Sequence, residues 1–273
     1  MTPHVTRDEA LVLEDVEAAA WRDLAERARP EDVAALGLRT HDLDGAFALT
    51  TTRAESLHWN RALGVGLHEP LRERTLVLLR HLARGREAGF AVPLCPFAAP
   101  DDAGRRLEAA GFATYLHHLK WWRDASPSEP VPTPFTIERV EPHGAEAWGA
   151  CAAELLGESP AHGAWLARAV GHGGWSHFWA LDGDDPVAVA ALHVHGDAAW
   201  LGLAATRTSH RRRGAQGALL AARIEHARAQ GVRVMTLETG PDWPDVPGEA
   251  LRNARRAGFR VAYERPVWLW TAV

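Results

Sequence analysis

Apolar residues in the first part of the chain recur with the periods of helices and strands. Thr6 and Glu9 have the spacing of a capping box, which predicts the start of a helix. The apolar positions that follow share one helical face, and Pro30 either ends this helix or starts a new short one. Further elements are predicted as strands at 46–52 and 57–67, a helix at 71–84, a strand at 90–95, a helix at 102–112 and a strand at 114–122.

Residues 124–134 interrupt this pattern. They contain four prolines, and proline is excluded from the interior of helices and central strands. The segment is therefore predicted to be an extended linker that reaches roughly 30 Å at about 3.1 Å per residue. It divides the chain into two expected domains, at 1–123 and 135–273.

The pattern resumes after the linker. The predicted strands are 135–140, 177–182, 187–196, 198–206, 232–238 and 260–270, and the predicted helices are 144–157, 160–170, about 214–230 and 249–257. This alternation indicates an α/β fold class, an α+β arrangement of a mixed sheet with flanking helices.

Two landmarks recur in both halves. Gly89 and Gly231 each stand between a helix and a strand, and Gly111-Phe112 and Gly258-Phe259 each end a later helix. This correspondence favours duplication of one domain, with coincidence as the alternative.

The stretch 206–231 carries the strongest chemical signal. Three arginines run into Gly214, and an amphipathic helix follows that Gly231 closes. Unpaired amides at a helix start bind anions, and adjacent arginines indicate a ligand with phosphates. A P-loop is excluded because the sole lysine is Lys120, and the dinucleotide fingerprint needs one more glycine than 211–217 contains. A solvated basic turn is the simpler alternative.

Composition narrows the classes of partner. The net charge of −5 argues against nucleic acid as the main partner. The two cysteines, Cys95 and Cys151, have no metal-ligand spacing and suit a reducing cytoplasm. No apolar run approaches about 20 residues and no signal region opens the sequence, so we expect no membrane association and a cytoplasmic protein.

The second half resembles the GNAT superfamily of acyl-CoA-dependent N-acyltransferases. The family signature is Arg/Gln-x-x-Gly-x-Gly/Ala, and Arg211-x-x-Gly214-x-Gln216 matches its first two positions. Gln216 departs from the third position, and Gly217 is displaced by one. The first half is similar to a degenerate copy, because its equivalent turn at 66–74 has no Arg-x-x-Gly. The resemblance therefore implies two tandem GNAT domains with one cofactor site.

The resemblance implies acetyl-CoA as the acyl donor and no metal. Amides of 212–217 would bind the pyrophosphate, and Arg207 or the arginine triplet would face the adenosine phosphate. The pantetheine arm would lie along the end of the strand at 198–206, with 232–238 splaying away from it. The cofactor residues so implied are Ala204, Ala205, Thr206, Arg211, Arg212, Arg213, Gly214, Ala215, Gln216, Gly217 and Asn253.

Two residues are candidates for the proton transfers. Glu238 ends the strand beside the expected thioester and could accept the proton of an acceptor amine, or it could cap a turn. The family's usual tyrosine acid is replaced by Ala254, and Tyr263 in the closing strand is the substitute candidate, with a sheet-packed tyrosine as the alternative.

Other side chains could contribute to the acceptor side. His193 and His195 share one strand face and would line an acceptor pocket or lie on the surface, whereas a metal site would need a third ligand. The acidic, aromatic loop at 240–249, with Asp242, Trp243, Asp245 and Glu249, would suit a cationic acceptor or be solvated.

The expected function is acetyl transfer to a primary amine of a small molecule or peptide. The alternative is a non-catalytic acyl-CoA-binding or sensor protein on the same scaffold, which the missing tyrosine favours. Nucleic-acid binding through Arg211, Arg212 and Arg213 is a third reading that the net charge opposes. A monomer or a homodimer is expected.

Overall fold

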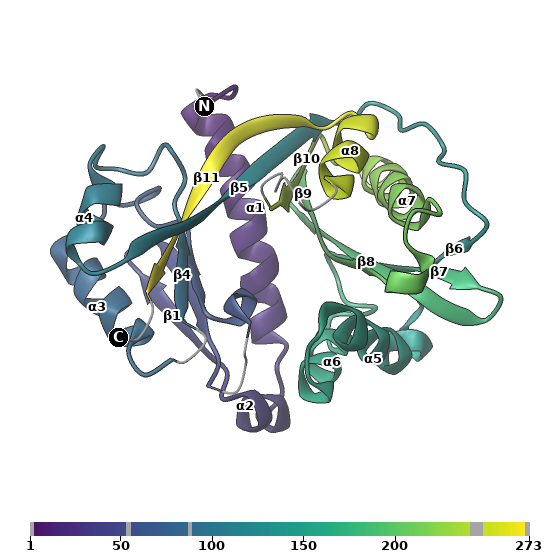
Figure 1. Cartoon of the computed structure of the whole chain (residues 1–273), viewed down its shortest axis with the longest axis horizontal. Helices are drawn as coiled ribbons and strands as arrows, with labels where there is room; N and C mark the ends of the chain where they lie inside the picture. Colours follow the sequence, from purple (N-terminus) through teal and green to yellow (C-terminus); the bar gives the residue numbers. More distant parts are fainter. Residues whose placement is uncertain (1–2, 53–55, 87–88, 241–247, 271–273) are drawn as a thin grey trace. The chain divides into compact units, whose positions relative to one another are not determined.

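The computed structural model describes residues 3–52, 56–86, 89–240 and 248–270. They form two compact units (Figure 1). The first unit holds the described residues of 1–26 and 30–120 and those from Val261 onwards, and the second holds 27–29 and the described residues of 121–260. The closing strand β11 (Arg260–Trp270) thus belongs mainly to the first unit, because it pairs with β4 (Phe90–Pro93). The domain limits expected from the sequence placed this strand in the second half.

The first unit is a mixed sheet with helices on both sides. Its helices are α1 (Arg7–Glu26), α2 (Pro30–Leu36), α3 (Glu73–Ala83) and α4 (Ala103–Ala109). Its strands are β1 (Arg39–Leu43), β2 (Ala46–Thr50), β3 (Arg61–Leu63), β4, β11 and β5 (Ala113–Asp124) as far as Lys120. The strand expected at 57–67 is instead a 3-10 turn, η1 (Leu57–Trp59), followed by β3, and β1 was not expected at all.

The strand order in this unit is β1-β2-β3-β4-β11, with the β3–β4 pair parallel and the other pairs antiparallel. Apolar side chains of α3 and α4, such as Leu79 and Leu107, cluster with Phe90 and Val92 of β4. Arg22 of α1 lies over the ring of Phe47 of β2. Because strand side chains alternate between faces, α1 covers one face, and α3 and α4 cover the other (Figure 1).

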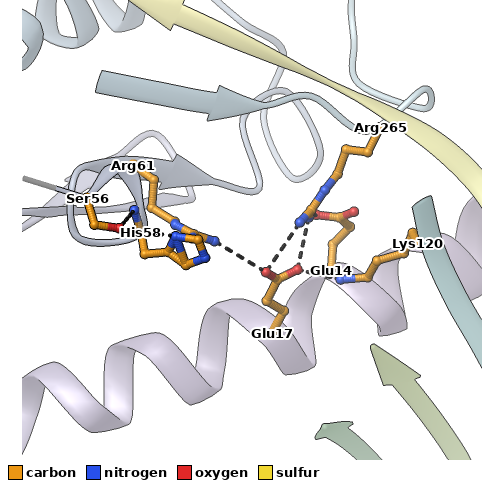
Figure 2. A network of polar contacts seen from close by, with 7 residues as sticks. All are labelled: Glu14, Glu17, Ser56, His58, Arg61, Lys120 and Arg265. Carbon is orange, nitrogen blue, oxygen red and sulfur yellow. Dashed lines mark hydrogen bonds and ion pairs between the residues drawn. The ribbon is translucent and has the colours of Figure 1, made fainter. Parts of the chain in front are cut away.

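A buried network of charges lies between α1 and the sheet of the first unit. Glu17 accepts hydrogen bonds from Lys120 of β5 and Arg265 of β11, and Glu14 accepts one from Arg265 (Figure 2). Arg61 of β3 lies 3.7 Å from Glu17. Burying charges is costly unless they are paired and hydrogen-bonded. The network therefore holds β11 to α1 only while every partner is present.

The second unit has the same type of architecture. Its helices are α5 (Ala145–Leu156), α6 (Pro160–Ala167), α7 (Ala215–Ala229) and α8 (Glu249–Arg256), with 3-10 turns η2 (Pro142–Gly144) and η3 (Thr208–His210). Its strands are β6 (Thr136–Arg139), β7 (Trp175–Asp182), β8 (Asp185–His195), β9 (Ala198–Thr206) and β10 (Val234–Thr239), in the order β10-β9-β8-β7-β6.

Two helical layers sandwich this second sheet. On one face, Ala215 and Leu219 of α7 pack with Phe178 of β7 and Ala190 of β8. On the other face lie α5 and α6, and Trp148 of α5 contacts the ring of His177 with the ring centroids 4.4 Å apart (Figure 1). Helices therefore pack on both faces of this sheet, and this packing fixes the positions of its strands.

The proline-rich segment is not a free spacer, because it lies along α7. The amide of Ser128 donates to Glu225, and Arg228 donates to the carbonyl of Ala125. A Cβ atom on Gly217 would lie 2.9 Å from the side chain of Val131. The segment therefore covers the outer side of α7, which explains why that helix is buried on more than its sheet-facing side.

The repeated Gly-Phe landmarks form the same local structure. Gly111 after α4 and Gly258 after α8 both have positive φ, at 98° and 81°. The amide of Phe112 donates to Leu107, and that of Phe259 donates to Ala254, the bond of a Schellman motif. The two helices end alike, as expected from duplication.

No helix among the described residues has the length and apolar character that crossing a bilayer requires.

Candidate functional site

The end of β9 carries a β-bulge. Ala191 of β8 pairs with Gly202, and Val189 pairs with Ala205, so two residues of β9, Leu203 and Ala204, lie opposite the single residue between these partners. Leu203 has a φ of 48°, which is rare for a branched apolar side chain. Bulges redirect backbone groups near functional sites, and this one lies directly before the predicted cofactor residues Ala204, Ala205 and Thr206.

The neighbouring strand β10 leaves β9 at the same level. Their parallel pairing covers Val234 to Thr236 against Ala198 to Trp200. Both strands continue beyond the last pair, β9 to Thr206 and β10 to Thr239. The last part of β9 therefore presents a backbone edge that β10 does not pair with, at the position where the resemblance implies that 232–238 splays away.

The turn after β9 leads into the first turn of α7. Arg212 and Gly214 have φ values of 62° and 86°, and Gly214 is the N-cap of the helix. Within the described part of the chain, the amides of 214–217 have no hydrogen-bond acceptor, and the first turn contains no acidic residue. Such a helix start attracts an anion through its free amides and the helix dipole.

The backbone requires glycine at position 214. Besides its positive φ, a Cβ atom there would lie 2.4 Å from the carbonyl oxygen of Pro132. The hydroxyl of Thr133 donates to the carbonyl of Arg213. The proline-rich segment thus supports the turn from outside and fixes its conformation.

The three arginines of the turn have different partners. Arg212 pairs with Glu249 at 2.9 Å, and Arg213 lies 3.5 Å from Asp182 and over the ring of Phe135. Arg211 donates to the carbonyl of Thr206, and it has no carboxylate partner in the described ranges. Arg211 is exposed, so it is the member of the triplet whose charge is most available to a ligand.

The remaining predicted cofactor residues lie around this turn. Gln216 donates to the hydroxyl of Thr206 at 2.8 Å, so it links the helix start to the strand end. Arg207 donates to the carbonyl of Pro186 and lies 3.6 Å from Glu154, which directs it towards β8 and α5. Asn253 is half-buried in α8, beside the fully buried Ala254.

The two candidates for proton transfer fall in different units. Glu238 is half-buried on β10, two residues beyond the last pair with β9. Tyr263 belongs to the first unit, is fully buried, and donates to Glu14 at 2.7 Å. Burial, with the nearby Glu14 charge, raises the pKa of Tyr263 well above its usual value. Its role as a general acid stays a prediction, and the observed contact is structural.

The two predicted histidines have different environments. His193 is buried against Trp175, with the ring centroids 4.7 Å apart, whereas His195 is exposed at the strand end. No group of three potential metal-ligating side chains occurs among the residues that the structure describes. The predicted acidic loop with Asp242, Trp243 and Asp245 lies outside the described residues.

Two features of the site were not foreseen. Leu203 gives no sequence signal, because a bulge depends on the pairing between two strands. Arg223 of α7 is buried with 3% exposure, although it occupies a helix in which a charged residue is normally assigned to the solvent face. The sequence did contain a signal for this burial, because Arg223 lies next to the apolar Ile224 and one turn after Leu219 and Leu220.

Most of the second unit matches a known protein family. A model described as "Acetyltransferase (GNAT) family" matches residues 119–245. This segment belongs to the GNAT family. No curated protein matches the chain.

Solved GNAT structures resemble nearly the whole chain. A GCN5-related N-acetyltransferase from Kribbella flavida is 17% identical, with a TM-score of 0.59, and the alignment covers 94% of this chain and 95% of that one. One from Sphaerobacter thermophilus is 18% identical, with a TM-score of 0.58 and coverage of 97% and 93%. A tandem GNAT protein from the clavulanic acid biosynthesis pathway is 15% identical, with a TM-score of 0.54 and coverage of 82% and 78%. These likenesses show that the chain has the mixed α/β fold of tandem GNAT proteins.

Proposed function

We propose that the chain is an N-acyltransferase that moves an acetyl group from acetyl-CoA to a primary amine of a small molecule or peptide. The observation that carries the proposal is a combination of three features in the second unit. The end of β9 is bulged, β10 does not pair with it there, and the amides of 214–217 at the start of α7 lack acceptors in the described chain. GNAT membership of residues 119–245 supports acyl transfer as the class of reaction.

The proposed cofactor contacts follow from the elements. The pyrophosphate binds the amides at the start of α7, where the dipole favours negative charge. The exposed Arg211 faces the 3′-phosphate of the adenosine. The pantetheine arm bonds to the unpaired edge of Ala204, Ala205 and Thr206 like an added strand, and Asn253 of α8 contacts it. No metal is required by this arrangement.

The proposed reaction is a direct attack on the thioester. The neutral amine forms a bond to the carbonyl carbon, and the resulting tetrahedral intermediate carries its negative charge on oxygen. Glu238, or a water that it orients, accepts the proton that the nitrogen loses. The carbon–sulfur bond then breaks, and the thiolate of coenzyme A takes a proton from water.

Calorimetry with coenzyme A tests the binding step. We expect one site per chain. Among the described residues, the start of α7 has an exposed arginine, Arg211, without a carboxylate partner, whereas Arg72 and Arg74 at the start of α3 pair with Glu69 and Asp44. Two sites would contradict the assignment of the cofactor to the second unit alone, and no binding would reject the proposal. A thiol-release assay with a panel of amines then tests turnover.

A non-catalytic acyl-CoA-binding or sensor protein is the second candidate. It is favoured by Ala254 at the usual position of the acid and by the contact that engages Tyr263 with Glu14. Coenzyme A binding without thiol release for any amine would support it. For either function we propose the cytoplasm as the compartment, which rests on the cysteine usage of the sequence.

A further inference from the structure

Arg223 is a buried cation beside the bulge of β9. It is 3% exposed, and no carboxylate among the described residues pairs with it. Burial lowers its pKa to about 9, so the guanidinium still carries its charge at neutral pH. A buried charge without a counter-ion is costly. Its presence among the buried apolar residues of α7, such as Leu219, Leu220 and Ile224, needs an explanation other than stability.

Backbone carbonyls take the place of a counter-ion. Nε of Arg223 donates to the carbonyl of Leu219, one turn earlier in α7. Nη1 donates to the carbonyl of Ala191 at 3.1 Å and to that of Gly202 at 3.4 Å. Ala191 and Gly202 are the last pair of β8 and β9 before the bulge. The guanidinium therefore binds both strands at the point where their register changes.

The peptide between Gly202 and Leu203 connects this charge to the splayed edge. One nitrogen reaches the carbonyls of both paired residues, so the Gly202 carbonyl lies on the β8 side of β9. In a trans peptide the carbonyl and the amide point in opposite directions, and the described residues have their one cis bond at Ala99-Pro100. The Leu203 amide therefore points away from β8, towards the edge that β10 has left.

We propose that Arg223 is a positioning residue that polarises the Gly202–Leu203 peptide, so that the Leu203 amide donates to the oxygen of the acyl carbonyl. A hydrogen bond to a carbonyl strengthens the donor at the other end of the same peptide, and the effect is greater in a low-dielectric interior. The buried charge also lowers the electrostatic energy of the oxyanion that forms in the transition state. This inference rests on the proposed acyl transfer and names the Leu203 amide as the donor to the acyl oxygen.

The infrared stretch of the bound thioester carbonyl tests this proposal, with acetyl-CoA labelled by ¹³C at that carbon. Polarisation by a donor moves the stretch to lower frequency than in free acetyl-CoA. We expect Arg223→Met to lose most of this shift and to lower kcat about ten- to hundredfold, somewhat less than removal of an oxyanion donor. The affinity for coenzyme A without an acyl group should stay within about twofold, because Arg223 does not reach the phosphate loop.

Further variants separate polarisation from packing. Arg223→Lys keeps a buried cation and should retain part of the shift. If Arg223→Met does not fold, the neutral and polar Arg223→Gln takes its place and should likewise lose most of the shift. Arg228→Met removes an arginine from the same helix whose contacts are with Ala125 and Glu225, and it should leave the shift unchanged.

The possible outcomes distinguish a failure of the role proposed for Arg223 from a failure of the proposed acyl transfer. A wild-type shift in Arg223→Met, or in Arg223→Gln if the methionine variant does not fold, overturns the role of Arg223 and leaves acyl transfer intact. A fall in kcat with an unchanged shift shows a packing role and likewise overturns it. Failure of the wild-type protein to bind acetyl-CoA overturns both proposals.

Discussion

Two helices that begin at comparable turns of the two units differ in what lies at their first turn. At α7, the amides of 214–217 have no acceptor within the described chain and no acidic side chain is present. At α3, Glu73 stands in the first turn, and the carboxylate of Asp44 accepts hydrogen bonds from Arg74 and from Thr75 at 2.6 Å. Asp44 comes from the turn between β1 and β2 and has a φ of 53°.

This difference explains why one unit is proposed to keep a cofactor site. A helix start attracts any nearby anion, including one that the protein itself supplies. In the first unit a carboxylate of the chain neutralises Arg74 at that position. In the second unit the cations outnumber the acids at the turn, and Arg211 has no carboxylate partner among the described residues. Absence of the Arg-x-x-Gly motif is therefore only part of the difference, because a carboxylate of the chain also occupies the arginine and the hydroxyl in the first turn of α3.

The largest effect should come from closing the helix start of α7. Gly214→Asp would place a Cβ atom against Pro132 and a carboxylate among the free amides. We expect coenzyme A affinity to fall at least about 100-fold, equivalent to about 3 kcal/mol, as measured by calorimetry. Gly231→Asp is the matched control, because Gly231 also has positive φ and ends the same helix but has open space around it. Equal losses in both variants would mean that strain in α7, and not the anion site, controls binding.

Removing single arginines should have a smaller, graded effect. Arg211→Ala should weaken coenzyme A binding about tenfold, since a charge-assisted contact is worth about 1.5 kcal/mol or more. Arg213→Ala should change it by less than about threefold, because that guanidinium is engaged with Asp182 and Phe135. Titration with dephospho-coenzyme A completes the test. A loss for Arg211→Ala that persists without the 3′-phosphate would show that Arg211 binds elsewhere on the cofactor.

The Asp44 contact should make a pH-dependent contribution to stability. Hydrogen bonds from Arg74 and Thr75 lower the pKa of Asp44 below its usual 3.8. A lowered pKa in the folded state stabilises the fold above the unfolded-state pKa, and this stabilisation is lost as pH falls through the folded-state value. Asp44→Asn should therefore lower the Tm at neutral pH by a few degrees. The difference from wild type should vanish in acid below the folded-state pKa, and a constant difference across the range would refute an ionic role.

The smallest effect is expected at Gln216, where the family signature has a small residue. The backbone amide is the proposed ligand, and the side chain bonds to Thr206 at 2.8 Å. Gln216→Ala should keep coenzyme A affinity within about threefold of wild type. A gain or loss beyond tenfold would show that the Gln216 side chain itself contacts or obstructs the phosphates.

The sequence predicted what depends on local pattern. Glycine at position 214 indicates the positive φ of the helix start, and Gly111 and Gly258 indicate the Schellman motifs that end two helices. These backbone conformations could be predicted because they depend on neighbouring residues alone. The strand β1 was missed because Arg39, Thr40 and His41 lack apolar alternation; they are held by pairing with β2, which is fully buried.

What the sequence could not predict depends on contacts between distant segments. Leu203 adopts a left-handed conformation because of the β8–β9 register, and Arg223 is buried because strand carbonyls accept its protons. Tyr263 was placed with the cofactor half because it follows that half in the chain, yet its hydroxyl contacts Glu14. The packing of 125–133 on α7 could not be predicted either. The proline content predicts an extended conformation, but it does not indicate which element the extended segment contacts.

The pairing of β11 with β4 has a consequence for biosynthesis. The ribosome synthesises the strands and helices of the second unit before it synthesises β11. The first unit therefore cannot complete its sheet until the second unit has been synthesised. Until Arg265 arrives, Glu14 and Glu17 of α1 lack one of their buried cations. The first unit, most of which precedes the second in the chain, is thus expected to reach its native state after the second unit, which reverses the usual N-terminal-first order of domain maturation.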